Sequence, residues 1–220
     1  MTNRESRNSV HILTDSLTLE GEIHLPQEAK GIVIFAHGSG SSRLSPRNTL
    51  VARVLRSAGL GTLLFDLLTR EEDTVYENRF DIALLARRLK AATQWVKTED
   101  HMKHLQIGYF GASTGAAAAL VAAEELGKEI KAIVSRGGRP DLAKEVLGHV
   151  FVPTLFIVGG NDDLVLKLNR DAVLHMRTKT DLKVIPGASH LFEEPGALEE
   201  VARLAAEWFT KYLTVNQAKH

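Results

Sequence analysis

Short apolar runs alternate with stretches of helical periodicity along most of this chain. The runs are rich in β-branched residues, as in strands buried on both faces of a sheet, and they lie at residues 31–36, 62–65, 105–110, 132–135, 154–158 and 182–185. The helical stretches lie at residues 47–57, 80–96, 114–126, 142–147, 166–176 and 198–213. This alternation predicts a mainly parallel sheet, connected by right-handed crossovers and held between two layers of helices.

The segment before this pattern and the lack of any interruption within it indicate how the chain is divided into domains. Residues 10–25 alternate apolar and polar side chains around Asp15 and Ser16, which predicts an antiparallel hairpin at the start of the sheet. No linker, internal repeat or low-complexity tract divides the chain, so we expect a single domain over residues 1–220. The interval between 132–135 and 154–158 has room for one short helix but not for a helical lid, and we therefore expect an open pocket.

Charge and composition exclude several classes of partner. The 27 Lys and Arg residues balance 27 Asp and Glu residues, so no net field attracts nucleic acid or an anionic membrane. The chain has no Cys, which excludes disulfides, thiolate metal sites and a cysteine nucleophile, and fits a reducing compartment. We find no secretory signal at the N-terminus and no apolar stretch of the roughly 20 residues that cross a bilayer. A soluble, cytoplasmic protein is the expectation.

The segment Gly111-Ala112-Ser113-Thr114-Gly115 carries the strongest functional signal. It is a G-x-S-x-G motif placed between a predicted buried strand and a predicted helix, which is the context of a nucleophile elbow. A serine on such a sharp turn has a strained backbone, and only minimal side chains two residues to either side avoid collision with it. We predict that Ser113 is a catalytic nucleophile.

A serine hydroxyl needs a general base at neutral pH, and histidine has the nearest suitable pKa. His190 follows the last predicted strand, where a loop can carry its ring across the end of the sheet. The alternative is a histidine on a surface loop. The other histidines weighed for this role lie in the hairpin, in a helix, in the C-terminal tail or in an HxxH pair, and are His11, His24, His175, His220, His101 and His104. The HxxH pair has no third ligand nearby, so we expect no metal site.

A carboxylate must fix the histidine tautomer and stabilise the imidazolium that develops. Asp162 and Asp163 both follow the strand at 154–158. Asp162 falls at the first turn beyond the strand, whereas Asp163 is better placed to cap the next helix, which is also the structural alternative for both residues. We therefore predict Asp162 as the third member of the triad.

Two backbone N–H groups are candidates for an oxyanion hole. One belongs to Thr114, next to the nucleophile, and the other to Ser39 in the glycine-rich loop after the first predicted parallel strand. A glycine-rich loop between strand and helix also occurs in nucleotide sites. Here Arg43 stands where a third glycine would be required, and no Gly-Lys-Ser/Thr follows, which argues against that function.

Together these residues resemble the α/β-hydrolase superfamily, and the compact, lidless form resembles its dienelactone-hydrolase-like group. The likeness covers nearly the whole chain and depends on residues 36–38, the elbow at 111–115, Gly159-x-x-Asp162 and Gly187-x-Ser189-His190, in that order. The resemblance implies an eight-stranded sheet with the second strand antiparallel, a triad at the carboxyl ends of the strands, and hydrolysis through an acyl-enzyme. The enzymes that name the group use a cysteine nucleophile. Serine at position 113 therefore leaves their lactone substrate in doubt and favours simple esterase chemistry.

Arg43 and Arg136 each follow a predicted strand whose carboxyl end faces the expected pocket. A guanidinium at this edge is able to hold a carboxylate or phosphate group of a substrate. The alternative for both is an arginine at the surface or paired with an aspartate. They are therefore candidate substrate-binding residues, separate from the catalytic set.

The sequence thus predicts a serine hydrolase that needs no cofactor and cleaves small carboxylic esters or lactones through an acyl-enzyme on Ser113. The same triad serves thioester, amide, peptide or phosphotriester bonds, because specificity resides in loop shape and pocket size. A catalytically silent binding module is the alternative from a different class. The expected partner is a small-molecule ester or lactone, with no nucleic acid and no membrane.

Overall fold

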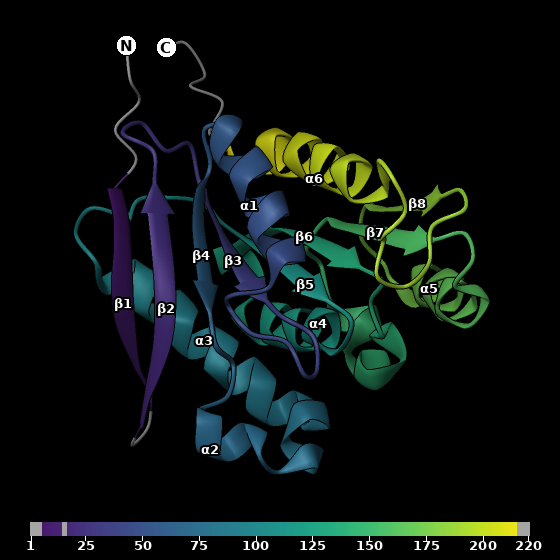
Figure 1. The fold of residues 1–220 in the computed structure, drawn as a ribbon, viewed down its shortest axis with the longest axis horizontal. Coiled ribbons are helices and arrows are strands. Elements are labelled where there is room, and N and C mark those ends of the chain that lie inside the picture. The colour runs from purple at the N-terminus through teal and green to yellow at the C-terminus, as the bar shows by residue number, and fades with distance from the viewer. Residues whose placement is uncertain (1–5, 15–16, 215–220) are drawn as a thin grey trace.

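A computed structural model describes residues 6–14 and 17–214 and contains one eight-stranded sheet (Figure 1). The order across the sheet is β1-β2-β4-β3-β5-β6-β7-β8. The strands are β1 (Ser6–Thr14), β2 (Leu17–Leu25), β3 (Ile32–Ala36), β4 (Gly61–Phe65), β5 (Ile107–Ala112), β6 (Ile130–Arg136), β7 (Thr154–Gly159) and β8 (Thr180–Ile185). This is the sheet of the α/β-hydrolase fold, as the sequence predicts.

The strands run parallel except at β2. That strand pairs antiparallel with β1 on one side and with β4 on the other, whereas the pairs from β4 to β8 are all parallel. The hairpin turn predicted at Asp15 and Ser16 lies outside the described residues. Because parallel strands end at the same edge, the loops that follow β3, β5, β6, β7 and β8 gather at the carboxyl edge of the sheet.

Helices cover both faces of the sheet (Figure 1). The helical segments are α1 (Pro46–Ser57), α2 (Arg70–Asp73), η1 (Tyr76–Phe80), α3 (Ile82–Thr98), α4 (Thr114–Leu126), η2 (Gly127–Glu129), η3 (Pro140–His149), α5 (Asp163–His175) and α6 (Ala197–Leu213). One face packs against α1 and α6, and the other against α3, α4 and α5. Within the described part of the chain, no helix has the length and apolar character needed to cross a membrane.

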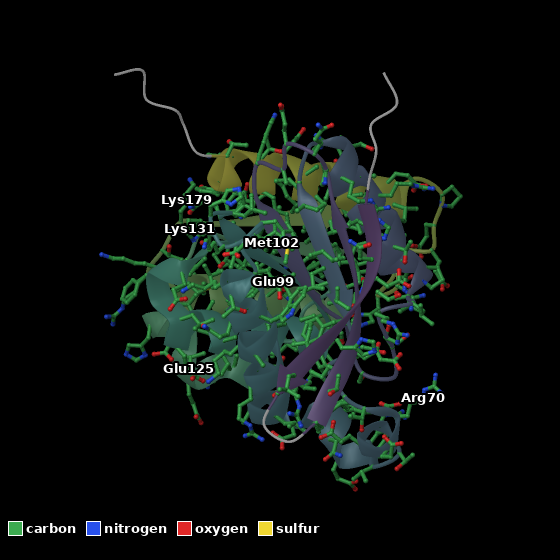
Figure 2. All side chains as sticks on the ribbon, turned by 90° about the vertical axis from the view of Figure 1, so that its left-hand side faces the viewer. Arg70, Glu99, Met102, Glu125, Lys131 and Lys179 are labelled. Atoms are coloured by element: carbon green, nitrogen blue, oxygen red, sulfur yellow. The ribbon has the colours of Figure 1, made fainter. Side chains whose placement is uncertain are left out.

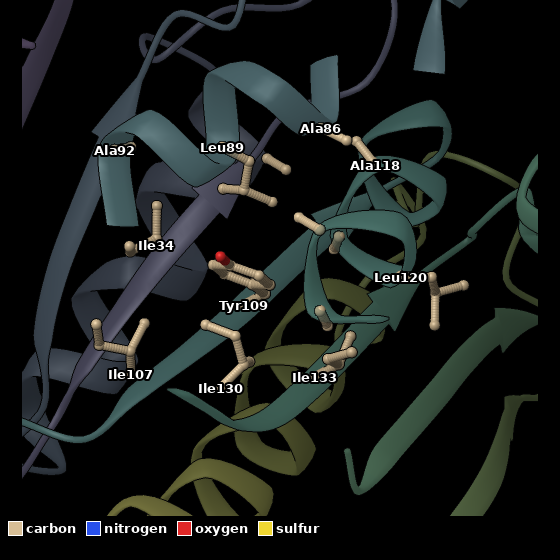
Figure 3. Close-up of a cluster of buried hydrophobic side chains, with 14 of the residues drawn as sticks. Ile34, Ala86, Leu89, Ala92, Ile107, Tyr109, Ala118, Leu120, Ile130 and Ile133 are labelled. Atoms are coloured by element: carbon tan, nitrogen blue, oxygen red, sulfur yellow. The ribbon is translucent and has the colours of Figure 1, made fainter. Parts of the chain in front are cut away.

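Helix α4 is buried through small side chains. This helix contributes a run of buried alanines between α3 and the central strands (Figure 3). Small side chains let the helix approach the sheet closely, so that Ala118 and Leu120 pack with Leu89 and Tyr109 in one cluster. The buried Tyr109 hydroxyl is hydrogen-bonded to Thr93 Oγ1 at 2.5 Å, which satisfies its polar atom.

Two segments differ from the sequence prediction. The short helix expected at 142–147 is a longer 3₁₀ segment, η3, with a kink at Ala143, and it alone lies between β6 and β7. The turns of α2 and η1 were not predicted, although Thr69 and Glu72 form a capping box that marks the start of α2. Side chains of this excursion, among them Arg70, extend from one end of the molecule (Figure 2). It builds one wall of the cavity described below.

Candidate active site

Ser113 occupies a strained turn between β5 and α4. Its φ of 51° and ψ of −119° are unusual for a residue with a side chain, and such strain persists only where the surroundings enforce it. Its N–H donates to the carbonyl of Arg136, and its carbonyl accepts from the N–H of Arg139, at 3.2 Å in both cases. The elbow is thus fixed to the end of β6.

The two glycines of the motif have no room for a side chain. A Cβ at Gly111 would lie 2.5 Å from the Cα of Ala116, and one at Gly115 would lie 2.1 Å from the carbonyl oxygen of Ala36. Both obstacles are backbone atoms, which cannot move aside as a flexible side chain can. The steric reason for the G-x-S-x-G pattern is therefore present in this chain.

His190 and Asp162 lie on the loops after β8 and β7 and meet at the same edge of the sheet. His190 Nδ1 lies 2.6 Å from Asp162 Oδ2, and because a carboxylate only accepts, the ring donates. Two hydrogen bonds join these loops. The backbone N–H of Asn161 donates to the carbonyl of Ala188, and the side-chain amide of Asn161 donates to the carbonyl of Gly187. The ring is therefore held with Nε2 free to accept a proton.

The expectation that Asp163 caps the next helix is wrong. α5 begins at Asp163, so the N-cap residue is Asp162, and its side chain makes no capping hydrogen bond. Its carboxylate bonds to His190 instead. Asp163 is exposed in the first turn, where its charge suits the helix dipole.

The His190 ring lies near the turn that contains Ser113, at the carboxyl edge of the sheet. A Cβ at Gly137, directly after β6, would lie 3.4 Å from His190 Cε1 and Nδ1. Gly137 follows the residue whose carbonyl accepts from Ser113 N–H, which brings the histidine and serine loops to one place. Among the described residues Ser113 Oγ has no hydrogen-bond partner, and nucleophile–base bonds often tighten only when substrate binds.

The two candidate oxyanion donors line one small hollow. Ser39, Thr114 and the flanking Gly38 and Gly40 share it. Thr114 is the first residue of α4, so its N–H has no partner within the helix. Gly38 lies close to Ser113, since a Cβ added at Gly38 would lie 3.2 Å from Ser113 Cβ. The loop that carries Ser39 and the start of α4 therefore lie next to each other, on the side of Ser113 where Gly38 packs.

His37 fixes the loop that carries Ser39, a function that the sequence analysis did not assign. Its Nε2 accepts the N–H of Leu67 at 3.0 Å, and its Nδ1 lies 3.0 Å from the carbonyl of Gly38. Burial lowers the pKa of His37 below its ordinary value, against the smaller opposing effect of the Gly38 hydrogen bond. The neutral ring therefore connects the loops after β3 and β4.

A cavity of about 500 Å³ opens beside this hollow. It lies between β2, the loop after β3 and the α2 excursion, and shares His37, Leu68 and Asp73 with the oxyanion hollow. Arg43 lines it, but the guanidinium is already paired with Asp66 and Glu20, and its backbone N–H also donates to Asp66. This pairing favours the structural alternative for Arg43.

Arg136, unlike Arg43, has no carboxylate partner among the described residues. It is the last residue of β6 and is 8% exposed, and its Nε and Nη1 are buried without a hydrogen-bond acceptor in the described part of the chain. The guanidinium carbon lies 5.9 Å from the centre of the Phe192 ring. Burial, together with the charge of Arg47, lowers the pKa of Arg136 to about 10, so that it stays charged at neutral pH.

The fold and the site define the class of the chain as an α/β-hydrolase. The sequence profile of the dienelactone hydrolase family matches residues 19–215, and the chain belongs to that family. A crystal structure of dienelactone hydrolase from Anabaena variabilis is 54% identical in sequence, covers 95% of this chain and 99% of its own, and superimposes with a TM-score of 0.92.

Two further comparisons concern proteins with other names. Two putative phosphoribosyl transferases of Mycobacterium tuberculosis are 54% identical over 204 residues, which is 93% of this chain and 46% of each relative. The chain thus spans about half the length of these curated relatives. A dienelactone hydrolase-like promiscuous phosphotriesterase from metagenomic libraries shares the fold, with a TM-score of 0.77, 18% identity, and coverage of 95% of this chain and 99% of its own.

Proposed function

We propose that this α/β-hydrolase is a serine esterase that cleaves small carboxylic esters or lactones through an acyl-enzyme on Ser113. The observation that carries the proposal is the 2.6 Å hydrogen bond between His190 Nδ1 and Asp162 Oδ2, in loops adjoining a serine held at φ 51°. Nucleophile, base and orienting carboxylate have the order and elements of a triad. We also propose that the protein is active without a cofactor.

The chemistry follows from the positions of these groups. His190 Nε2 removes the proton of Ser113 Oγ as that oxygen attacks the acyl carbon, while Asp162 stabilises the imidazolium. The N–H groups of Ser39 and Thr114 stabilise the alkoxide of the tetrahedral intermediate. His190 then protonates the oxygen of the leaving alcohol. The bond between this oxygen and the acyl carbon breaks, the alcohol departs, and the acyl group stays on Ser113. Water, deprotonated by the same ring, releases the acid and restores the serine.

The test is a burst measurement with 4-nitrophenyl esters of increasing acyl length. We expect a stoichiometric burst of nitrophenol in the wild type, and a loss of nearly all turnover in Ser113→Ala with an unchanged circular dichroism spectrum. A matched control is Ser57→Ala, an exposed serine at the end of α1 and outside the proposed chemistry. Undiminished turnover in Ser113→Ala would contradict the proposal.

The same panel separates the alternatives. Thioesters, anilides and a phosphotriester test whether the triad acts on another bond, since the triad alone does not select one. Labelling by a fluorophosphonate identifies an activated serine independently of substrate, and absence of labelling favours a binding module. The mycobacterial relatives extend well beyond the region that they share with this chain. The proposal concerns this shared region alone, and none of its steps uses a phosphoribosyl group.

A further inference from the structure

The histidine side of the site contains a buried cation without a counter-ion. Arg136 is more than nine-tenths buried, yet no ion pair or hydrogen bond satisfies its guanidinium among the described residues. An isolated buried charge is costly, and proteins ordinarily pair such a group or coordinate it. The Phe192 ring compensates only in part, because a cation–π contact supplies no hydrogen-bond acceptor.

A second arginine, Arg47, also lacks a hydrogen-bond acceptor for one of its buried nitrogens among the described residues. Arg47, in the first turn of α1, has an enclosed Nε without an acceptor and reaches only Glu193, at 3.4 Å, with its Nη1. Glu193 directly follows Phe192, the residue whose ring lies under the Arg136 guanidinium, so both arginines reach the same short segment of chain. In the described part of the chain the two like charges have between them one long, exposed carboxylate contact, which leaves room for a further anion.

The position of Arg136 relates this region to the proposed chemistry. Its backbone carbonyl accepts the N–H of Ser113, and a Cβ added at the next residue, Gly137, would lie 3.4 Å from the His190 ring. Arg136 belongs to the face of the sheet that packs against α1 and Phe192, since Phe192 and the β6 residues Ala132 and Val134 share one apolar cluster. With Nε and Nη1 enclosed, Nη2 is the nitrogen that an incoming anion reaches first.

We propose that Arg136, assisted by Arg47, binds an anionic group of the substrate, a carboxylate or a phosphate, while the ester carbonyl lies at Ser113. This inference rests on the proposed function and names the class of substrate within it: esters whose acyl or alcohol part ends in an oxyanion. Hydrogen bonds to a charged partner are about twice as strong as neutral ones, so the anion contributes both affinity and orientation.

The first experiment measures anion binding without catalysis. Thermal unfolding of Ser113→Ala is followed with increasing succinate or inorganic phosphate, at ionic strength held constant with chloride. An anion that binds only the folded state raises the Tm in a saturable manner. We expect this rise for at least one of the two anions, its absence in Ser113→Ala/Arg136→Met, and its retention in Ser113→Ala/Arg203→Met. Arg203 is exposed and paired on α6, so it controls for net charge.

The folding of the variant is not an obstacle. Replacing an unpaired buried cation with an apolar side chain removes its desolvation cost, so Arg136→Met should unfold at the same temperature as the parent or higher. Arg136→Lys is the second variant. It keeps the charge but loses the planar guanidinium, and we expect a weaker anion-induced shift than in the parent.

The second experiment measures selectivity, using the monomethyl esters of succinate, glutarate and adipate against their dimethyl esters. We expect the wild type to hydrolyse one of the monomethyl esters with a kcat/KM about ten- to a hundredfold above its neutral counterpart. Arg136→Met should lose this preference through its effect on the charged substrate. The preferred chain length then reports the separation between Ser113 and Arg136.

The outcomes separate the two proposals. If no ester is hydrolysed but succinate or phosphate stabilises the parent and not Arg136→Met, the anion site stands and the esterase proposal fails. If neutral and charged esters react equally and neither anion shifts the Tm, the esterase proposal stands and the anion site is overturned. An equal Tm shift in the parent and in Arg136→Met also overturns it. Responses to succinate and phosphate identify which anionic group the site prefers.

Discussion

The two sides of Ser113 differ in how fully their polar groups are satisfied. On the oxyanion side, His37 accepts from Leu67, Arg43 pairs with Asp66, and Arg79 binds Asp73 through Nε and Nη2. On the histidine side, Arg136 has no counter-ion among the described residues. Arg43 thus has built-in partners that hold two elements of the scaffold together, whereas Arg136 has none in the described part of the chain, and this difference is the basis for proposing a ligand at Arg136 alone.

The largest effect is expected from the short hydrogen bond between His190 and Asp162 on the histidine side. Asp162→Asn leaves the geometry intact but no longer fixes the imidazole in the required tautomer, and kcat should fall about 10⁴-fold with little change in Tm. Steady-state kinetics with a 4-nitrophenyl ester measure it. Asp163→Asn is the matched control and should retain activity, because its exposed carboxylate does not contact His190. Equal losses in both variants would contradict the assignment of Asp162.

The next effect contrasts the two arginines directly. Arg43→Met leaves Asp66 and Glu20 without their cation, and we expect the free energy of unfolding to fall by about 1–3 kcal/mol, as when a charged hydrogen-bond partner is deleted. Arg136→Met should produce no such loss. Urea denaturation of both variants measures the contrast, and a larger loss at position 136 would reverse the comparison.

The oxyanion side should also respond to acid. The pKa of His37 in the folded protein lies below the ordinary 6.5, so the unfolded chain takes up a proton that the folded chain refuses. The contribution to stability is complete above pH 6.5 and is lost as the pH falls toward the folded pKa. Urea denaturation from pH 8 to 5 measures it. His37→Gln, which cannot titrate, should show a shallower decline, and an identical decline would contradict this cause.

The smallest effect is expected at the rim of the histidine side. Glu193→Gln removes the long, exposed contact with Arg47, and stability should change by less than about 1 kcal/mol. Succinate or phosphate affinity, measured by calorimetry, should stay the same or rise, since a competing carboxylate is gone. A loss of affinity would show that Glu193 helps to bind the anion.

The sequence predicted the sheet well because buried parallel strands have a distinctive composition, and the family resemblance supplied the antiparallel β2. It also selected His190 and Asp162, which the structure joins by a hydrogen bond, since loops after parallel strands meet at one edge. It could not distinguish Arg43 from Arg136. Their local patterns are similar, and the difference lies in Glu20 and Asp66, which are remote from Arg43 along the chain.

The α2 excursion was missed for another reason. Its turns are too short for helical periodicity, and only the Thr69 and Glu72 capping box marks them. The function of His37 depends on Leu67, a partner that only the fold supplies.

The alanine-lined helix α4 has a consequence for motion. Its inner residues are buried against α3 and the central strands, and the helix begins directly after Ser113. Amide hydrogens in such a region exchange with solvent only through openings close to global unfolding. We therefore expect the amides in the middle of α4 to exchange slowly, and the backbone of Ser113 to keep a constant position relative to the sheet.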